Sequence, residues 1–279
     1  EVTRSRRASE FQSSKEVVGR VIKELVALRE SDNHITGVRT GYQDLDRMTN
    51  GFQRGDLIIL AARPAMGKTA LALNLGMYTA LRNPGAVAFF SLEMPAESLM
   101  KRLLSAKSQV EGNKLRGGNI SDDELNRLNE AGNELGAAKI FIDDSASIKV
   151  SQIFSKCRKL MSEYGLSLIV IDYLQLISGS GRGGGDNRQQ EVSEISRNLK
   201  ILAKEMNCPV IALSQLSRSV EQRTDKQPML SDLRESGAIE QDADIVMFLY
   251  REDYYKKTSE QEERSDINEV VDLNLAKHR

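Results

Sequence analysis

The sequence predicts an α/β fold in which a mostly parallel, twisted sheet is flanked by helices. Three observations predict it. From residue 57 onward, short apolar runs of strand length alternate with segments of helical periodicity, as parallel strands with helical connections require. The first run leads into a glycine-containing loop followed by a helix. Several later runs end in polar residues, as strands do where a parallel sheet binds a ligand at its carboxyl edge.

The chain before this alternation is expected to form a linker and one helix. Residues 1–14 are polar and basic, which favours a flexible linker. Residues 15–30 follow with apolar side chains at helical spacing, and this stripe must be buried either on its own domain or on a neighbouring subunit. We favour the neighbour, and we expect one α/β domain to span residues 31–279. The stripe consists of Val17, Val18, Val21, Ile22, Leu25 and Leu28.

The alternating region predicts seven strands and six helices. The strands are expected at 57–61, 86–92, 139–143, 166–172, 209–214, 245–250 and 270–276. The helices are expected to begin near Gly67, Pro95, Ser121, Ser151, Asp186 and Ser231. Two of them carry the pattern of a capping box, Ser121 with Glu124 and Asp186 with Gln189. The glycine-rich segment 178–187 reads equally well as a flexible linker and as a functional loop.

Composition excludes several classes of protein. A net charge of −1 gives no global basic field, so any nucleic-acid contact must be local. Cys157 and Cys208 lie in apolar patterns without metal-ligand spacing, which favours buried free thiols in a reducing compartment. His34 and His278 are far apart and give no support to a zinc site. The apolar runs fall short of the ~20 residues that span a bilayer, and no secretory signal is seen, so we expect a soluble, cytoplasmic protein.

The loop after the first strand resembles a phosphate-binding loop with one departure. The pattern G-x-x-x-x-G-K-[ST] is met by Gly67, Lys68 and Thr69, but Ala62 stands where the first glycine belongs. Backbone N–H groups, the lysine and the hydroxyl carry the chemistry of such a loop, and alanine fits the first position if its φ stays negative. We therefore expect the loop to bind ATP phosphates and its hydroxyl to ligate Mg²⁺. The expected loop residues are Ala62, Arg63, Pro64, Ala65, Met66, Gly67, Lys68 and Thr69.

Three strand ends supply candidate catalytic groups. Asp172 ends "SLIVIDYLQLI", and a carboxylate at the end of a buried strand is well placed to hold a metal ion. Glu93, in "VAFFSLEM", could orient and deprotonate the attacking water, or it could instead open the helix that begins near Pro95. Gln215, in "PVIALSQLSR", could sense the γ-phosphate with its neutral amide, or lie in an ordinary turn.

Together these motifs resemble the DnaB type of hexameric replicative DNA helicases, which share the RecA-like ATPase core. The resemblance runs from about Phe11 to Arg279. It rests on "TGYQDLDRMTNGFQRGDLIILAARPAMGKT", "FFSLEM", "LIVIDYLQLI", "ALSQLSR", "LRESGAIEQDAD" and "LAKHR", in family order and with compatible spacing.

The resemblance implies a role for each site residue. Lys68 and Thr69 would serve the phosphates and Mg²⁺, Glu93 the water, Asp172 the metal and Gln215 the γ-phosphate. Two further sets follow from the family alone. Lys277 and Arg279 would act as basic fingers in the nucleotide site of the adjacent subunit, and Arg182, Arg234, Glu235 and Gly237 would lie in loops that hold single-stranded DNA.

The resemblance also implies partners: a ring-shaped homohexamer, single-stranded DNA, a primase and a helicase loader, at replication forks in the nucleoid. The family's amino-terminal helical domain and carboxyl-terminal tail are missing from the pattern, so the chain reads as a fragment. Two rival functions stay open. The first is a recombinase-like or clock-like ATPase on the same core, and the second is a nucleotide-gated assembly scaffold that does not unwind DNA.

Overall fold

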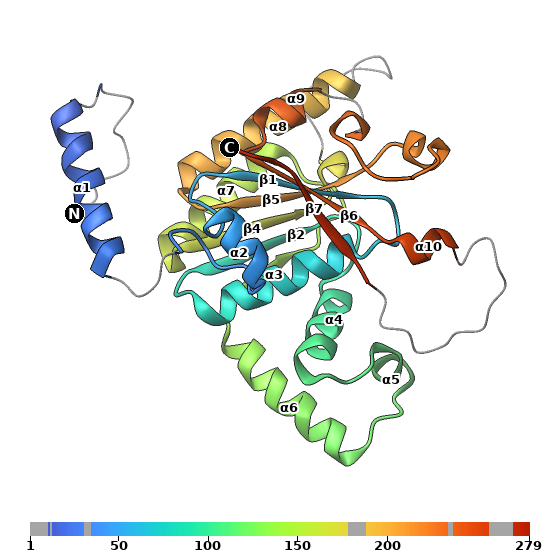
Figure 1. The fold of residues 1–279 in the computed structure, drawn as a ribbon. Helices are drawn as coiled ribbons and strands as arrows, with labels where there is room; N and C mark the ends of the chain where they lie inside the picture. The colour runs from blue at the N-terminus through green and yellow to red at the C-terminus, as the bar shows by residue number, and fades with distance from the viewer. Residues whose placement is uncertain (1–10, 12, 31–34, 178–187, 234–236, 257–269) are drawn as a thin grey trace. The chain divides into compact units, whose positions relative to one another are not determined.

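The computed structural model describes residues 11, 13–30, 35–177, 188–233, 237–256 and 270–279 (Figure 1). The chain divides into two compact units, residues 1–36 and 37–279, and each is described by itself. In the first unit the predicted helix is confirmed as α1 (Ser14–Glu30), and apolar side chains such as Val18, Ile22 and Leu25 are exposed on it. Most of the predicted linker 1–14 lies outside the described residues.

The second unit contains a twisted, mostly parallel sheet, which confirms the predicted fold class. The strand order is β3-β2-β4-β5-β1-β6-β7, and β7 is antiparallel to β6 while the other neighbouring pairs are parallel. The strands are β1 (Leu57–Ala62), β2 (Ala86–Ser91), β3 (Ile140–Asp143), β4 (Leu166–Asp172), β5 (Val210–Gln215), β6 (Ile245–Tyr250) and β7 (Asp272–His278). Each predicted strand is present within two residues of its expected bounds.

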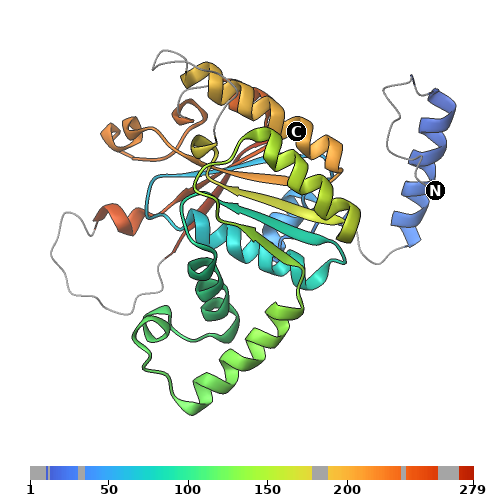
Figure 2. The same ribbon diagram turned by 180° about the vertical axis from the view of Figure 1, so that it is seen from behind.

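Helices cover both faces of this sheet, as Figures 1 and 2 show from opposite sides. α2, α3, α4 and α6 contribute to the core on one face, and α7, α8 and α9 to the core on the other. The helices of this unit are α2 (Gln43–Thr49), α3 (Lys68–Arg82), α4 (Ala96–Ser108), α5 (Gly112–Gly117), α6 (Asp122–Ala137), α7 (Val150–Tyr164), α8 (Arg188–Met206), α9 (Gly237–Asp242) and α10 (Glu252–Lys256). Short 3₁₀ turns lie at η1 (Leu174–Leu176), η3 (Arg218–Gln222) and η4 (Leu230–Asp232).

Strand β1 shows why the apolar runs lack a polar face. Leu57, Ile59 and Ala61 point into the core on the α8 side, whereas Ile58 and Leu60 point into the core on the α3 side. Both faces of a parallel strand are covered by helices, so every position is buried. Burying each leucine or isoleucine contributes about 1.5–3 kcal/mol, and this holds β1 and the loop that follows it in a fixed place.

The helix predicted near Ser231 is wrong. A three-residue 3₁₀ turn, η4, stands there, and α9 begins only at Gly237. The Asp232 carboxylate accepts a hydrogen bond of 2.7 Å from the backbone N–H of Met229 and pairs with Arg223, while Leu233 forms a bridge with Leu216. These contacts close the turn and bring Leu233 beside Leu216, so residues 230–233 form no α-helix.

The two predicted capping boxes have different outcomes. The backbone N–H of Ser121 donates to Glu124 Oε2 at 3.0 Å, and the N–H of Glu124 donates to Ser121 Oγ at 3.3 Å, which confirms the first box at the start of α6. The second box depends on Asp186, which lies outside the described residues.

The prediction that both cysteines are buried free thiols is confirmed. Cys157 and Cys208 are buried and form no disulfide, and burial raises the pKa of each thiol to about 12.

Across the parts of the chain that the structure describes, no helix combines the length and the apolar character needed to cross a bilayer. In the same parts, no three His, Cys, Asp or Glu side chains gather as a metal-binding group.

Candidate nucleotide-binding site

The loop between β1 and α3 has the shape that the sequence predicts. Ala62 is the last residue of β1 and is buried in extended backbone, so the missing glycine costs nothing there. Two later positions adopt the left-handed region, Gly67 with φ of 92° and Ala65 with φ of 65°. A side chain at Gly67 would meet no atom within 4 Å, so the backbone angle and not space favours glycine at this position.

Thr69 and Asp172 meet at the start of α3. The Thr69 hydroxyl donates a hydrogen bond of 2.7 Å to Asp172 Oδ2, and the Asp172 side chain lies at the carboxyl end of β4. Its other oxygen, Oδ1, is buried without a hydrogen-bond partner. A hydroxyl beside a carboxylate with an unsatisfied buried oxygen fits Mg²⁺, which takes one or two protein oxygens and leaves its other positions to water and phosphate.

Lys68 interacts electrostatically with both acidic residues that the sequence singles out. Burial lowers the pKa of its ammonium group below the ordinary value, and the carboxylates of Asp172 and Glu93 oppose that shift. Its Nζ also lies 5.1 Å from the centroid of the Tyr173 ring. The positive charge is therefore held in a partly desolvated position, where it attracts an anion more strongly than it would in open water.

A pocket of about 420 Å³ brings the predicted groups together at the carboxyl edge of the sheet. Residues 63–70 form one wall, and Glu93, Tyr173 and Gln215 are among the residues that line the rest. Strand register explains the convergence, because Ser91 on β2 pairs with Asp172 on β4 and Ala62 on β1 pairs with Gln215 on β5. Strands of equal register end together, so their last side chains face one space.

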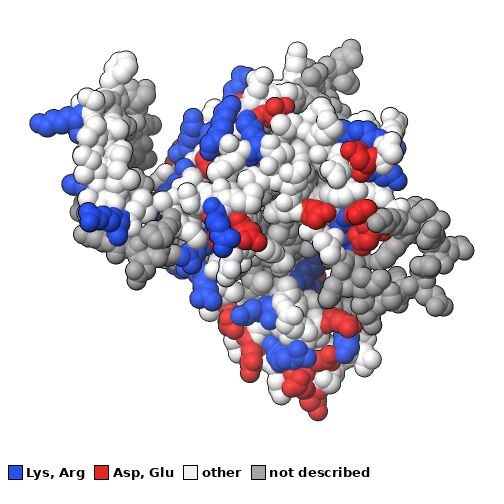
Figure 3. All heavy atoms as spheres, in the orientation of Figure 1, with Lys and Arg blue, Asp and Glu red and all other residues white. Residues whose placement is uncertain are grey.

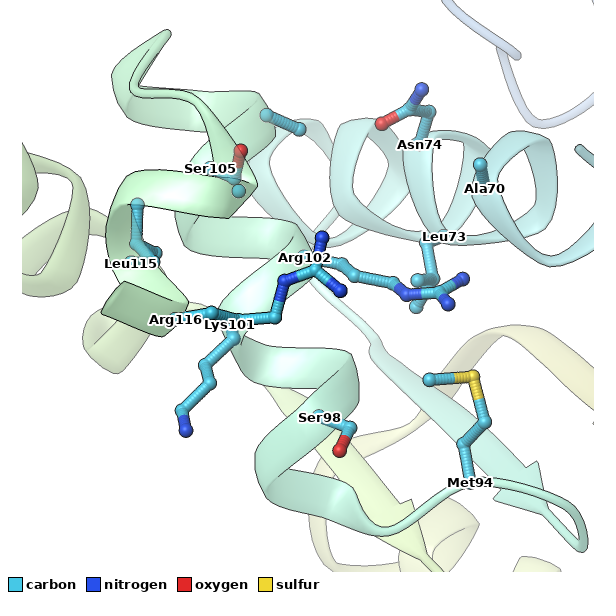
Figure 4. A pocket seen from close by; sticks show the side chains of 12 residues that line it. Ala70, Leu73, Asn74, Met94, Ser98, Lys101, Arg102, Ser105, Leu115 and Arg116 are labelled. Carbon is cyan, nitrogen blue, oxygen red and sulfur yellow. The ribbon is translucent and has the colours of Figure 1, made fainter. Parts of the chain in front are cut away.

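Arg102 is a lining residue that sequence reasoning missed. Arg102, on α4, lines the phosphate pocket and also an adjoining pocket of about 650 Å³ between α3, α4 and α5. In Figure 4 its side chain extends toward the side where Met94 lies. The sequence offered one sign of Arg102, a basic residue in the helix that follows the Glu93 strand, but basic residues on helices are usually solvated.

Arg63, one of the predicted loop residues, is bonded to protein groups. Its Nε donates to Glu221 at 2.8 Å and its Nη1 donates to the carbonyl of Leu216 at 2.9 Å, which ties the loop to the segment after β5.

The predicted fingers lie at the opposite edge of the sheet. β7 runs antiparallel to β6, and His278 pairs with Ile245, so the chain ends beside the amino end of β6. Lys277 Nζ donates a hydrogen bond to the carbonyl of Glu240, and the N–H of Arg279 donates to the carbonyl of Asp244 at 3.1 Å. Burial lowers the pKa of Lys277, and the charge of Arg279 adds to that shift. Figure 3 shows basic side chains gathered where the chain ends.

The predicted DNA-contact residues are mostly untested by the structure. Arg182, Arg234 and Glu235 lie outside the described residues. Gly237 is the first residue of α9, and a side chain there would meet no atom within 4 Å.

Comparison with known proteins agrees with this geometry. Residues 37–279 match the family model described as the DnaB-like helicase C terminal domain. The whole chain is 52% identical to the replicative DNA helicase DnaB of Geobacillus stearothermophilus and 52% identical to the replicative DNA helicase DnaC of Bacillus subtilis. It spans 60% of the length of each of these curated relatives.

Solved structures give the same assignment. One of them, described as an ATPase domain, matches with a TM-score of 0.87 at 41% identity, over 97% of this chain and 92% of that one. A DnaB-like replicative helicase, solved in a study of its interactions with primase, matches with a TM-score of 0.83 at 40% identity, over 99% of this chain and 64% of that one. The core is therefore RecA-like, and the chain belongs to the family of DnaB-like helicase C-terminal domains.

Proposed function

We propose that this chain is the ATP-driven motor of a replicative DNA helicase, which moves along single-stranded DNA in the 5′ to 3′ direction and unwinds the duplex ahead of it. The observation that carries the proposal is the phosphate pocket, where the loop, Lys68, Glu93 and Gln215 face one space beside Thr69 and Asp172. Similarity to replicative helicases over the full chain supports the same activity.

Each residue has a physical task in hydrolysis. The N–H groups of the loop and the ammonium of Lys68 bind the phosphates, and Thr69 and Asp172 hold Mg²⁺, which supplies positive charge to the phosphate oxygens. Glu93 orients the attacking water and accepts its proton. Gln215 senses the γ-phosphate by hydrogen bonding, and Arg102 adds a positive charge on the Glu93 side of the pocket.

A second copy completes the site. Lys277 and Arg279 lie at the amino edge of the sheet, one strand length of ~20 Å from the carboxyl edge that carries their own chain's pocket. They therefore serve a neighbouring subunit, as a ring-shaped homohexamer allows. The same ring gives the exposed apolar stripe of α1 a surface to cover it on the next subunit. The organisation that follows is a linker at 1–14, a docking helix at 15–30 and the ATPase domain at 31–279.

The DNA and protein partners belong to the same proposal. Arg182, Arg234, Glu235 and Gly237 contact single-stranded DNA in the ring channel, and a primase and a loader associate with the longer protein, in the cytoplasm at the replication fork. A structural relative was solved for its interactions with primase, which supports the primase.

The testing experiment measures ATP turnover by this chain with and without single-stranded DNA. We expect Mg²⁺-dependent turnover that rises when single-stranded DNA is added. Turnover that DNA does not change would favour a clock-like ATPase, and nucleotide binding without turnover would favour an assembly scaffold.

A further inference from the structure

Glu93, the residue proposed to activate the attacking water, lies on a short turn between β2 and α4. β2 ends at Ser91 and α4 begins at Ala96, so residues 92–95 connect them. The Glu93 side chain is exposed, and the described residues donate no hydrogen bond to its carboxylate. Its place in the pocket therefore depends on the backbone that carries it, because an exposed glutamate without a bonded partner keeps its rotamer freedom.

The hydroxyl of Ser91 closes this turn from the inside. It donates a hydrogen bond of 2.7 Å to the carbonyl of Met94 and accepts one of 3.3 Å from the backbone N–H of Met94. Both bonds span Glu93, which lies between these two residues in the chain. Ser91 is only 2% exposed, so water does not readily replace either bond. Met94, labelled in Figure 4, is thereby held at the start of the segment that leads into α4.

A third bond joins the same turn to the residues proposed to hold Mg²⁺. The backbone N–H of Leu92 donates to the carbonyl of Asp172 at 2.7 Å, and Ser91 pairs with Asp172 in the sheet. The Asp172 side chain in turn accepts the hydrogen bond from Thr69. The turn that carries Glu93 and the proposed metal ligands are therefore linked through one residue of β4.

We propose that Ser91 is a positioning residue for ATP hydrolysis, whose hydroxyl fixes the turn so that the Glu93 carboxylate faces the phosphate pocket. This inference rests on the proposed function, because it assumes that Glu93 acts on the attacking water. A general base must lie within hydrogen-bond reach of the proton it accepts, and a misplacement of about 1 Å can lower a rate by ~10²-fold. Ser91 itself does not line the phosphate pocket, so it acts only through the turn.

The chain offers a closely matched control at the other end of α4. The Ser108 hydroxyl donates a hydrogen bond of 2.7 Å to the carbonyl of Leu104 and accepts one of 3.3 Å from the N–H of Val110. Ser108 is buried like Ser91, with 6% of its surface exposed, but it does not line the phosphate pocket or adjoin Glu93. Ser91→Ala and Ser108→Ala therefore remove the same two kinds of bond from buried positions.

The test measures kcat, KM and equilibrium ATP affinity with Mg²⁺ for the parent chain and for both variants. We expect Ser91→Ala to lower kcat by about 10–100-fold and to keep ATP affinity within about twofold, because the phosphate loop is unchanged. Ser108→Ala should keep both quantities within about twofold of the parent. Ser91→Cys serves if Ser91→Ala does not fold, because a thiol has a similar volume but forms weak hydrogen bonds, and its kcat should also fall.

A double-mutant cycle separates positioning from a general effect on the structure. In Glu93→Gln the base is already absent, so the further change Ser91→Ala should alter the residual turnover by less than about twofold. A general structural defect would instead lower turnover by the same factor in both backgrounds. The residual rates are measured as phosphate released during long incubations, with Lys68→Ala as the blank.

The outcomes distinguish this inference from the proposed function. Equal kcat in Ser91→Ala and Ser108→Ala would overturn the inference, as would an undiminished effect of Ser91→Ala in the Glu93→Gln background. Either result, beside a Glu93→Gln variant that binds ATP without hydrolysing it, would leave the proposed function intact. Hydrolysis by Glu93→Gln at the parent rate would overturn the water-activating role itself, and the positioning role with it.

Discussion

At the scale of single residues, the pocket combines a largely buried lysine with two carboxylates in different environments. Asp172 is buried and bonded to Thr69, whereas Glu93 is exposed on the pocket wall. A buried carboxylate that keeps one oxygen free suits a metal ion, and an exposed one suits a mobile water. The two acids therefore differ by environment, although both follow apolar strands in the sequence.

The first prediction tests Glu93 as the base. Glu93→Gln should keep ATP binding, because the loop and Lys68 are intact, and should lower turnover by ~10²–10⁴-fold. Glu97→Gln is the matched control, since Glu97 lies in the first turn of α4 and lines none of the pockets described above. Nucleotide binding by fluorescence and phosphate release measure the two effects. Hydrolysis by Glu93→Gln at the parent rate would remove the water-activating role.

At the scale of elements, the strands were predictable and the short connections were not. Runs such as residues 168–172 are buried on both faces, so their apolar character indicates where the strand lies. α2, α5 and α10 span seven residues or fewer and carry no periodic stripe, so tertiary packing decides them. Arg102 escaped detection for a related reason, because an arginine on an amphipathic helix looks like solvated charge.

The second prediction concerns the packing of α3 against β2. A side chain at Gly76 would approach the Phe89 ring to 2.2 Å, so Gly76→Ala should destabilise the domain by about 1–3 kcal/mol. Gly136→Ala in α6 is the matched control, because a side chain there meets nothing within 4 Å and alanine favours the helix by about 0.5–1 kcal/mol. Urea unfolding should move the two midpoints in opposite directions. A Gly76→Ala midpoint no lower than that of the parent would show that the Phe89 ring moves aside without a cost in stability.

At the scale of the whole molecule, net charge gives no support to the proposed DNA binding, and the sheet separates the phosphate pocket from the proposed fingers, Lys277 and Arg279. The net charge of −1 confines DNA contacts to local groups, and the sequence motifs assign these to Arg182 and to residues 234–237. The sequence could predict that a phosphate loop, Glu93 and Gln215 share one pocket and that Asp172 lies beside the loop. It could not place Lys277 and Arg279 at the far edge, because that depends on β7 pairing antiparallel with β6.

The third prediction concerns Arg234. Arg234→Ala should weaken binding to oligothymidylate and oligoadenylate alike, because phosphate contacts do not distinguish bases, and should leave basal ATP turnover measurable. The slope of log K against log salt concentration should fall in magnitude by ~0.7. Arg158→Ala is the control, since Arg158 pairs with Glu205 on the surface of α7 and α8. Unchanged affinity and slope for both oligonucleotides would take Arg234 out of the DNA path.

The last prediction tests the site between subunits. Arg279 is exposed at the amino edge of the sheet and Lys68 lies at the carboxyl edge, so each variant damages a different half of an interface. Arg279→Ala and Lys68→Ala should each lose turnover alone. When they are mixed, an intact loop from the first variant can meet an intact finger from the second, and some ATP turnover should return. Fluorescent labels on the two variants report whether subunits exchange. If exchange is complete and the mixture still shows no ATP turnover, Arg279 acts within its own chain.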